Sequence, residues 1–130
     1  LSMATESESR RALASGYFLD QATIDWMIAH YCPPGVDTAD PRISPLGADD
    51  LSGLPPAHVH TAAFDPLRCE GHAYADRLKR AGVEVRYTCH LGMIHHFYGM
   101  ADAIPYARVA IDSIGADIRE ALASGARKAA

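Results

Sequence analysis

The sequence predicts an α/β fold built on one parallel βαβ unit, and three consecutive segments carry this prediction. Residues 58–64 (HVHTAAF) form a short run that ends at an Asp-Pro turn and is typical of a strand. Residues 67–80 place apolar side chains at helical spacing, and Gly82 suits the end of that helix. Residues 83–89 alternate apolar and polar side chains, as a half-buried strand does. A strand, a helix and a strand in this order are joined by a right-handed crossover, so the strands run parallel.

Two further helices are expected to flank this unit. Asp20 precedes the first and is suited to cap the free amides of its opening turn. Its apolar side chains recur at helical spacing and predict one buried stripe: Ile24, Met27, Ile28 and Tyr31. The second begins near Pro105, which suits a first helical position, and is expected to end before Gly125. Its predicted stripe is Ala107, Ile111, Ile114, Ile118 and Leu122.

The composition is that of one globular domain, with 130 residues, 48 % hydrophobic and 22 % charged. No apolar run approaches the ~20 residues that a membrane span needs, and no signal peptide is evident. A net charge of −4 without a basic cluster argues against nucleic acid or an anionic membrane as a partner. Cys32, Cys69 and Cys89 lack metal or redox spacing, which predicts a reduced, cytoplasmic protein; a reactive thiol is the alternative.

The parallel strands are expected to bring an acid and an imidazole to one edge of the sheet. Asp65 follows the first strand, and His95 and His96 follow the second, inside a segment (91–100) expected to be a loop. The carboxyl ends of parallel strands open on the same edge, so these side chains should be neighbours. A carboxylate that orients an imidazole makes a general base, which activates a Ser, a Cys or water. On spacing alone, a helix-capping Asp and a solvated His are the favoured interpretation.

Several sequence blocks, in order between Gly16 and Leu122, carry a family resemblance: GYFLD, SPL, LSGLPPA, TAAFDPLRCEG, YADRLKRAGVEV and GMIHHFYGM. They resemble the C-terminal part of the hormone-sensitive lipase family of α/β-hydrolase esterases. The resemblance implies a partial α/β-hydrolase fold and, for the complete enzyme, cofactor-free hydrolysis of a small-molecule carboxylic ester. It also implies that Asp65 of the DPL motif is the triad acid. His95, which opens the His-His-Phe tripeptide, is then the triad base.

Two positions depart from the family pattern. Cys69 stands where the family has Asp, and His96 stands where it has the Gly that follows the catalytic His. An imidazole at this position loses the backbone freedom of Gly and alters the loop. His96 is therefore an alternative base, and Glu70 is an alternative acid.

The nucleophile and the oxyanion hole that the resemblance requires are absent from this sequence. An α/β-hydrolase carries both on a G-x-S-x-G elbow and an HGGG-type loop that precede the Asp and the His. None of the eight serines lies on such an elbow, and no H-G-G string occurs. We expect this chain alone to be inactive and to need a missing N-terminal half, or self-association through its strand edges. The alternative is a non-catalytic remnant that acts only in assembly or binding.

The chain is expected to have three parts. Residues 1–15 form a polar lead-in, of which 1–11 are predicted to be a loop. Residues 16–124 form the C-terminal part of an α/β-hydrolase domain, and residues 125–130 form a tail. Within the domain, residues 33–57 are rich in Pro, Asp and Gly and are expected to be a surface loop.

Two groups of apolar side chains are candidates for a substrate pocket, with core packing as the alternative for both. The first flanks the expected base: Met93, Ile94 and Phe97. The second lies on the first helix, where core packing is the favoured interpretation: Trp26, Met27 and Tyr31. His58 and His60 share a strand face, but no third ligand is evident, so no metal site is expected.

Overall fold

The computed structural model describes residues 1–4 and 6–129, with side chains up to residue 123. The chain divides into two compact units, residues 1–95 and residues 96–130. The division falls between the two adjacent histidines. Among the described residues, no helix combines the length and the apolar composition needed to cross a membrane.

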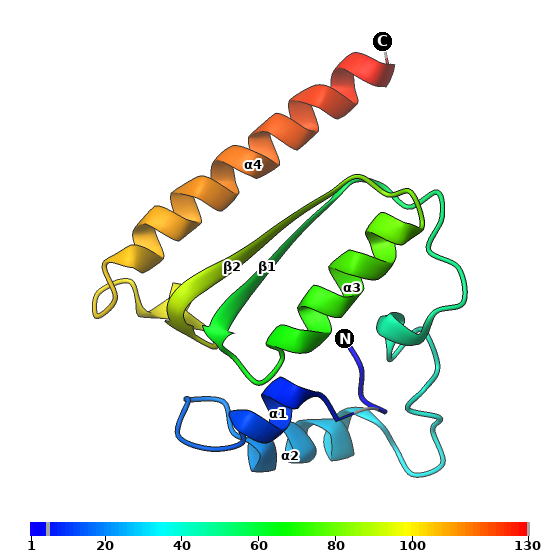
Figure 1. Ribbon diagram of the computed structural model, residues 1–130, viewed down its shortest axis with the longest axis vertical. Helices are drawn as coiled ribbons and strands as arrows, with labels where there is room; N and C mark the ends of the chain where they lie inside the picture. Colours follow the sequence, from blue (N-terminus) through cyan, green and yellow to red (C-terminus); the bar gives the residue numbers. More distant parts are fainter. Residues whose placement is uncertain (5, 130) are drawn as a thin grey trace. The chain divides into compact units, whose positions relative to one another are not determined.

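The first unit contains the predicted parallel βαβ arrangement. Strand β1 (Ala57–Phe64) pairs in parallel with strand β2 (Val85–Ile94), and helix α3 (Arg68–Arg80) connects them. Figure 1 shows α3 running alongside the two strands. The prediction of two parallel strands with a helical crossover is confirmed.

A small apolar core holds α3 and the strands together. Leu51, Leu78 and Val83 are buried against one another. Close approach of α3 to β1 depends on Gly71, because a Cβ at this position would lie 2.6 Å from the Thr61 Cγ2 atom. A larger residue would force the helix and the strand apart.

The segment before β1 is irregular, apart from one 3-10 turn, η1 (Pro45–Gly47). It is nevertheless fixed to the body of the unit. The Arg77 guanidinium of α3 donates hydrogen bonds to the carbonyl oxygens of Leu46 and Ala48. The Met3 amide donates to Ser44 Oγ at 2.8 Å. The long connection is thus held by side chains and by the amino-terminal residues.

Strand β2 is longer than predicted. The expectation of a loop from residue 91 is wrong for residues 91–94, which belong to β2. The register shifts between Ala62 and Phe64 of β1, so that Phe64 pairs with Ile94. Gly92 lies in this irregular stretch with a φ of 75°, a backbone conformation that favours glycine. The bulge breaks the alternation that marks a strand in sequence, and β2 ends directly before His95.

The amino-terminal segment is not the loop that was predicted, because residues 8–12 form helix α1 (Glu8–Ala12). The Ser7 hydroxyl caps it by accepting a hydrogen bond from the Arg10 amide at 3.3 Å. Ser9 and Arg10 are buried although both are polar. Burial of polar side chains requires partners elsewhere in the fold, and local sequence pattern cannot reveal those partners.

Helix α2 (Gln21–Tyr31) begins where predicted, and the Asp20 carboxylate accepts a hydrogen bond from the Thr23 amide at 2.7 Å. The predicted buried stripe is wrong, because Ile24 is its only buried member among these described residues. Met27 and Tyr31 are more than half exposed, at 52 % and 65 %. Figure 1 shows α1 and α2 next to each other. They lie near the end of the sheet at which β1 leads into α3.

The second unit contains a 3-10 turn, η2 (Phe97–Met100), and helix α4 (Tyr106–Ala129). The prediction that α4 ends before Gly125 is wrong, because a single Gly costs only about 1 kcal/mol in a helix and good helix formers follow it. The predicted stripe is only partly buried. Ala107 is buried, whereas its larger members Ile111, Ile118 and Leu122 are exposed.

Candidate active site

Asp65 is the first residue after β1, and each of its carboxylate oxygens has a partner. Oδ1 accepts a hydrogen bond from the Leu67 amide at 2.8 Å, which closes the turn that leads into α3. Oδ2 lies 2.9 Å from Nδ1 of His95. The Asp65 side chain is 14 % exposed and that of His95 is 35 % exposed. The acid is therefore sheltered, while the imidazole remains accessible.

The contact with Asp65 assigns different tasks to the two ring nitrogens of His95. A carboxylate accepts hydrogen bonds only, so Nδ1 must carry the proton that fills the 2.9 Å contact. In a neutral ring Nε2 is then the basic nitrogen. This is the tautomer that takes a proton from a nucleophile, with the carboxylate stabilising the imidazolium that forms.

The alternative acid has a different partner. Glu70 Oε1 lies 2.6 Å from Arg10 Nε. The two groups form an ion pair, but the geometry is not that of a hydrogen bond. Its Oε2 accepts a hydrogen bond from the Ser2 amide at 2.9 Å. The Glu70 side chain is 2 % exposed. These contacts occupy the Glu70 carboxylate, and the structure favours Asp65 as the partner of His95.

The alternative base, His96, belongs to the second unit and has an unusual backbone. Its φ is 59° and its ψ is 17°, which is the left-handed region that favours glycine. The position at which the family has Gly is thus one where the backbone conformation calls for Gly. The His96 ring lies over Gly99, where an added Cβ would lie 2.3 Å from Nε2.

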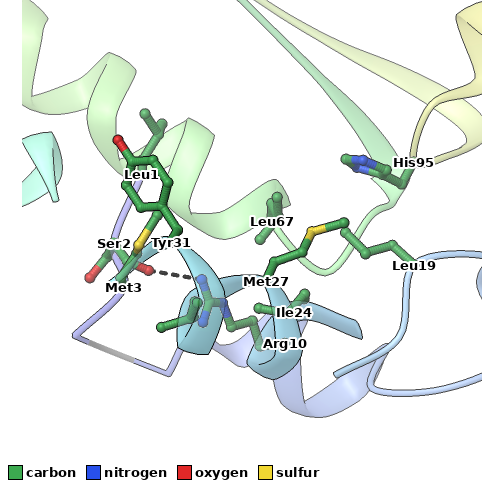
Figure 2. Close-up of a pocket in the computed structure, with 11 residues that line it drawn as sticks. Leu1, Ser2, Met3, Arg10, Leu19, Ile24, Met27, Tyr31, Leu67 and His95 are labelled. Atoms are coloured by element: carbon green, nitrogen blue, oxygen red, sulfur yellow. Dashed lines mark hydrogen bonds between the residues drawn. The ribbon is translucent and has the colours of Figure 1, made fainter. Parts of the chain in front are cut away.

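A pocket of about 340 Å³ opens beside His95, within the size range of ligand pockets. Its wall is mainly apolar and comes from the chain start, α1, α2 and the turn after Asp65. In Figure 2 the Met27 side chain extends from α2 past Leu67, toward Leu19. The lining residues are Leu1, Ser2, Met3, Arg10, Leu19, Ile24, Met27, Ile28, Tyr31, Leu67 and His95.

The structure places only some of the pocket residues predicted from the sequence in the pocket wall. Met27 and Tyr31 line the pocket, so the favoured prediction that they pack in the core is wrong. Trp26 is 61 % exposed and its ring contacts His30. Among the described residues of the first unit, Met93 and Ile94 are half-buried and are not part of this lining. Phe97 is buried in the second unit, with ring contacts to Tyr98 and Tyr106.

Sequence reasoning missed the rest of the pocket wall. Leu67 could have been predicted from the sequence, because it follows Asp65 by two positions and so lies at the edge of the sheet where the site was expected. Leu19 directly precedes the Asp20 cap and had no functional signal, and Ile24 was predicted only as a member of the buried stripe of the first helix. Arg10 had no signal, because its place in the wall depends on the buried contact with Glu70.

The pKa values of Cys69 and His90, both in the first unit, are shifted from their ordinary values. Burial opposes ionisation of the Cys69 thiol, but contacts with Ser9 and Arg68 outweigh it and hold its pKa below the usual value. Burial, and then the neighbouring His60, lowers the pKa of His90. The nitrogens His60 Nδ1 and His90 Nε2 lie 3.2 Å apart across the strand pair. All three cysteines are free thiols.

A parallel βαβ unit with an Asp after one strand and a His after the next has the architecture of an α/β hydrolase. The family model of the alpha/beta hydrolase fold matches residues 1–99. The chain therefore belongs to the α/β-hydrolase family, in its esterase and lipase branch. The family predicted from the sequence is confirmed.

The relatives are ester hydrolases. The chain is 45 % identical to carboxylic ester hydrolase LipN of Mycobacterium tuberculosis (strain ATCC 25618 / H37Rv) over 94 residues, 70 % of this chain and 24 % of that protein. It is 39 % identical to an arylesterase of Saccharolobus solfataricus over 113 residues, 86 % of this chain and 37 % of that protein. It superposes with a TM-score of 0.88 and 44 % identity on an ester-hydrolase from the metagenome of Lake Arreo, covering 95 % of this chain and 39 % of that one. The chain thus spans well under half the length of these relatives.

Proposed function

We propose that this chain supplies the acid and the base of a carboxylic ester hydrolase, with Asp65 orienting His95 and His95 acting as the general base. The observation that carries the proposal is the 2.9 Å contact between Asp65 Oδ2 and His95 Nδ1 at the active edge of the sheet. The named relatives support the reaction class, since they are ester hydrolases. In this proposal residues 16–124 are the C-terminal part of the catalytic domain.

The reaction proceeds by acyl transfer through a serine. His95 Nε2 takes the proton of the serine hydroxyl as its oxygen attacks the ester carbonyl carbon. The resulting imidazolium then gives that proton to the departing alkoxide, which leaves as the alcohol. Water next attacks the acyl-serine carbonyl carbon while Nε2 takes the proton of the water. The imidazolium then returns this proton to the serine oxygen as the carbon–oxygen bond to serine breaks, which releases the carboxylic acid and restores the serine. Asp65 stabilises the imidazolium in both halves and keeps Nδ1 protonated.

The nucleophile comes from residues outside this sequence. None of the eight serines here lies on a G-x-S-x-G elbow, and the alignments cover 24 % and 37 % of the two curated relatives. Without a nucleophile and an oxyanion hole, a base and an acid give only residual catalysis. This chain alone is therefore expected to show no ester turnover.

The substrate is a small-molecule ester with an apolar group that enters the pocket beside His95. Support comes from the mainly apolar wall, to which α2 contributes Ile24 and Met27. The pocket residues expected from sequence alone, Met93, Ile94 and Phe97, stay a prediction. The free cysteines are consistent with a reducing compartment, and we place the protein in the cytoplasm on that ground.

The partner of this chain is the N-terminal half of the domain or, in its absence, a second copy. Among the described residues the sheet has only the strands β1 and β2, so each strand has one edge without a paired strand. Unpaired strand edges pair readily with further strands. Light scattering of the purified chain should therefore show an assembly, and a monomer at micromolar concentration would contradict this.

The test uses the protein that contains this sequence together with its nucleophile. His95→Ala should abolish turnover of para-nitrophenyl acetate, because His95 is the group that deprotonates the serine in this proposal. His72→Ala is the matched control, since His72 is an exposed residue of α3 whose side chain faces Asp76. Full activity of His95→Ala would refute the proposal and favour the alternative, a chain that acts only in assembly or binding.

A further inference from the structure

The start of α3 lacks a capping side chain of its own. Its N-cap residue is Leu67, which has no side-chain oxygen and makes no capping hydrogen bond. The first amides of a helix have no partner within the helix and need acceptors from elsewhere. Asp65 serves two of them, because its Oδ1 accepts from the Leu67 amide at 2.8 Å and its carbonyl oxygen accepts from the Arg68 amide at 3.0 Å.

Ser9 serves the next amide from a distant part of the chain. The Cys69 amide donates a hydrogen bond to Ser9 Oγ at 3.1 Å, across 60 positions of sequence. The Ser9 hydroxyl in turn donates to the Pro66 carbonyl oxygen at 2.6 Å. Ser9 is completely buried, so both contacts are shielded from bulk water. One side chain of α1 thus bridges the two ends of the turn that follows Asp65.

The neighbouring ion pair holds α1 in this place. Arg10 follows Ser9, Glu70 follows Cys69, and Arg10 Nε lies 2.6 Å from Glu70 Oε1. Arg10 Nη2 also donates to the Ser2 carbonyl oxygen at 2.8 Å. Both charged side chains are buried, and removing one partner of a buried pair is strongly destabilising. Two consecutive residues of α1 therefore meet two consecutive residues of α3.

From this geometry we infer that Ser9 is a positioning residue for the catalytic acid, acting by fixing the turn Asp65–Pro66–Leu67 against α1. The inference rests on the proposed function, because it assigns Ser9 a role through Asp65. Without the Ser9 hydroxyl, the Pro66 carbonyl and the Cys69 amide lose their partner inside the protein. The turn then relaxes, and the Asp65 carboxylate no longer meets His95 in one fixed orientation.

The effect is expected in the chemical step. A displacement of about 1 Å in a catalytic geometry costs up to about 100-fold in rate. Ser9→Ala should therefore lower kcat by about 10- to 100-fold with little change in KM.

The experiment compares three variants of the protein that contains this sequence and its nucleophile, with para-nitrophenyl acetate as substrate. Ser15→Ala is the matched control, because Ser15 is exposed and follows α1. Asp65→Asn is the reference for complete loss of the acid. The inference predicts a kcat for Ser9→Ala between those of the two, with a KM close to that of Ser15→Ala. A kcat for Ser9→Ala that matches the kcat of Ser15→Ala would overturn it.

Two further outcomes are separable. If Asp65→Asn itself keeps full activity, the proposed function fails and the inference fails with it. If Ser9→Ala does not fold, Ser9→Cys replaces it, since a thiol of similar size is only a weak hydrogen-bond donor and acceptor. Ser9→Cys should then show a smaller loss of kcat, again with little change in KM. A Ser9→Cys variant with the kcat of the parent protein would overturn the inference.

Discussion

Asp65 faces His95 with one carboxylate oxygen while the other closes its own turn. Oδ2 lies 2.9 Å from His95 Nδ1, and Oδ1 accepts the Leu67 amide at 2.8 Å. The same side chain therefore orients the imidazole and anchors the backbone from which it acts. Substitutions that separate the two tasks test the account in detail.

Asp65→Asn should remove catalysis while keeping the turn. The Asn amide retains an oxygen for the Leu67 amide, but its NH₂ group favours the wrong tautomer of His95, and such a change lowers kcat by about 10⁴-fold. Asp65→Ala should also lose the turn contact, at about 1 kcal/mol of stability. Steady-state kinetics and urea unfolding of both variants make the comparison. Equal free energies of unfolding for Asp65→Ala and Asp65→Asn would show that the hydrogen bond from the Leu67 amide to Asp65 does not stabilise the turn.

Stability should fall as the pH decreases below neutrality because of His90. Burial, and then His60, lowers the pKa of His90 from its ordinary value of 6.5. The unfolded chain then binds the proton more readily than the folded chain does. The stability that this group contributes is present above pH 6.5 and is lost as the pH falls through the lower folded-state pKa.

The measurement is the urea midpoint at neutral pH and at about pH 5. His90→Gln should flatten the pH dependence, and the exposed His72→Gln serves as its control. An unchanged slope in His90→Gln would assign the effect to other groups.

The His96 backbone predicts a coupling between two positions of the second unit. A Cβ at Gly99 would lie 2.3 Å from the His96 ring, so Gly99→Ala must displace that ring. Gly99→Ala should cost about 1 kcal/mol when His96 is present and much less in a His96→Gly background. Thermal unfolding of the single and double variants gives the coupling energy. Strict additivity would mean that the ring moves aside without cost.

Met27 should limit the length of the apolar group that the pocket accepts. Its side chain lines the pocket from α2, whereas its neighbour Trp26 is exposed outside this lining. Met27→Trp should raise KM for butyrate and longer esters about tenfold and leave acetate nearly unchanged. Trp26→Ala is the control and should alter neither. An equal rise in KM for esters of all chain lengths would mean that Met27 does not determine which chain length the pocket accepts.

The sequence was informative where structure is local or set by the direction of the strands. The parallel pair and the Asp20 cap follow from spacing and residue type, and so does the approach of Asp65 and His95. Features that depend on distant partners could not be predicted. Burial of Ser9 needs the Pro66 carbonyl, which lies 57 positions away. Exposure of the predicted apolar stripes on α2 and α4 depends on which surfaces pack against those helices, and helical spacing does not encode that.

The length of β2 was missed for a local reason. The Gly92 bulge interrupts the alternation, so the last residues of the strand resemble a loop. The consequence reaches the site, because His95 follows this strand end directly. Where a strand ends decides which of two adjacent histidines faces the acid.

The most direct measurement is the low-field proton signal of the imidazole Nδ1–H that is hydrogen-bonded to Asp65, recorded by NMR on protein with ¹⁵N-labelled histidine. The account predicts one such signal, which disappears in both Asp65→Asn and His95→Ala and persists in His96→Ala. A signal that survives in His95→Ala, or that disappears only in His96→Ala, would contradict the assignment of His95 as the base.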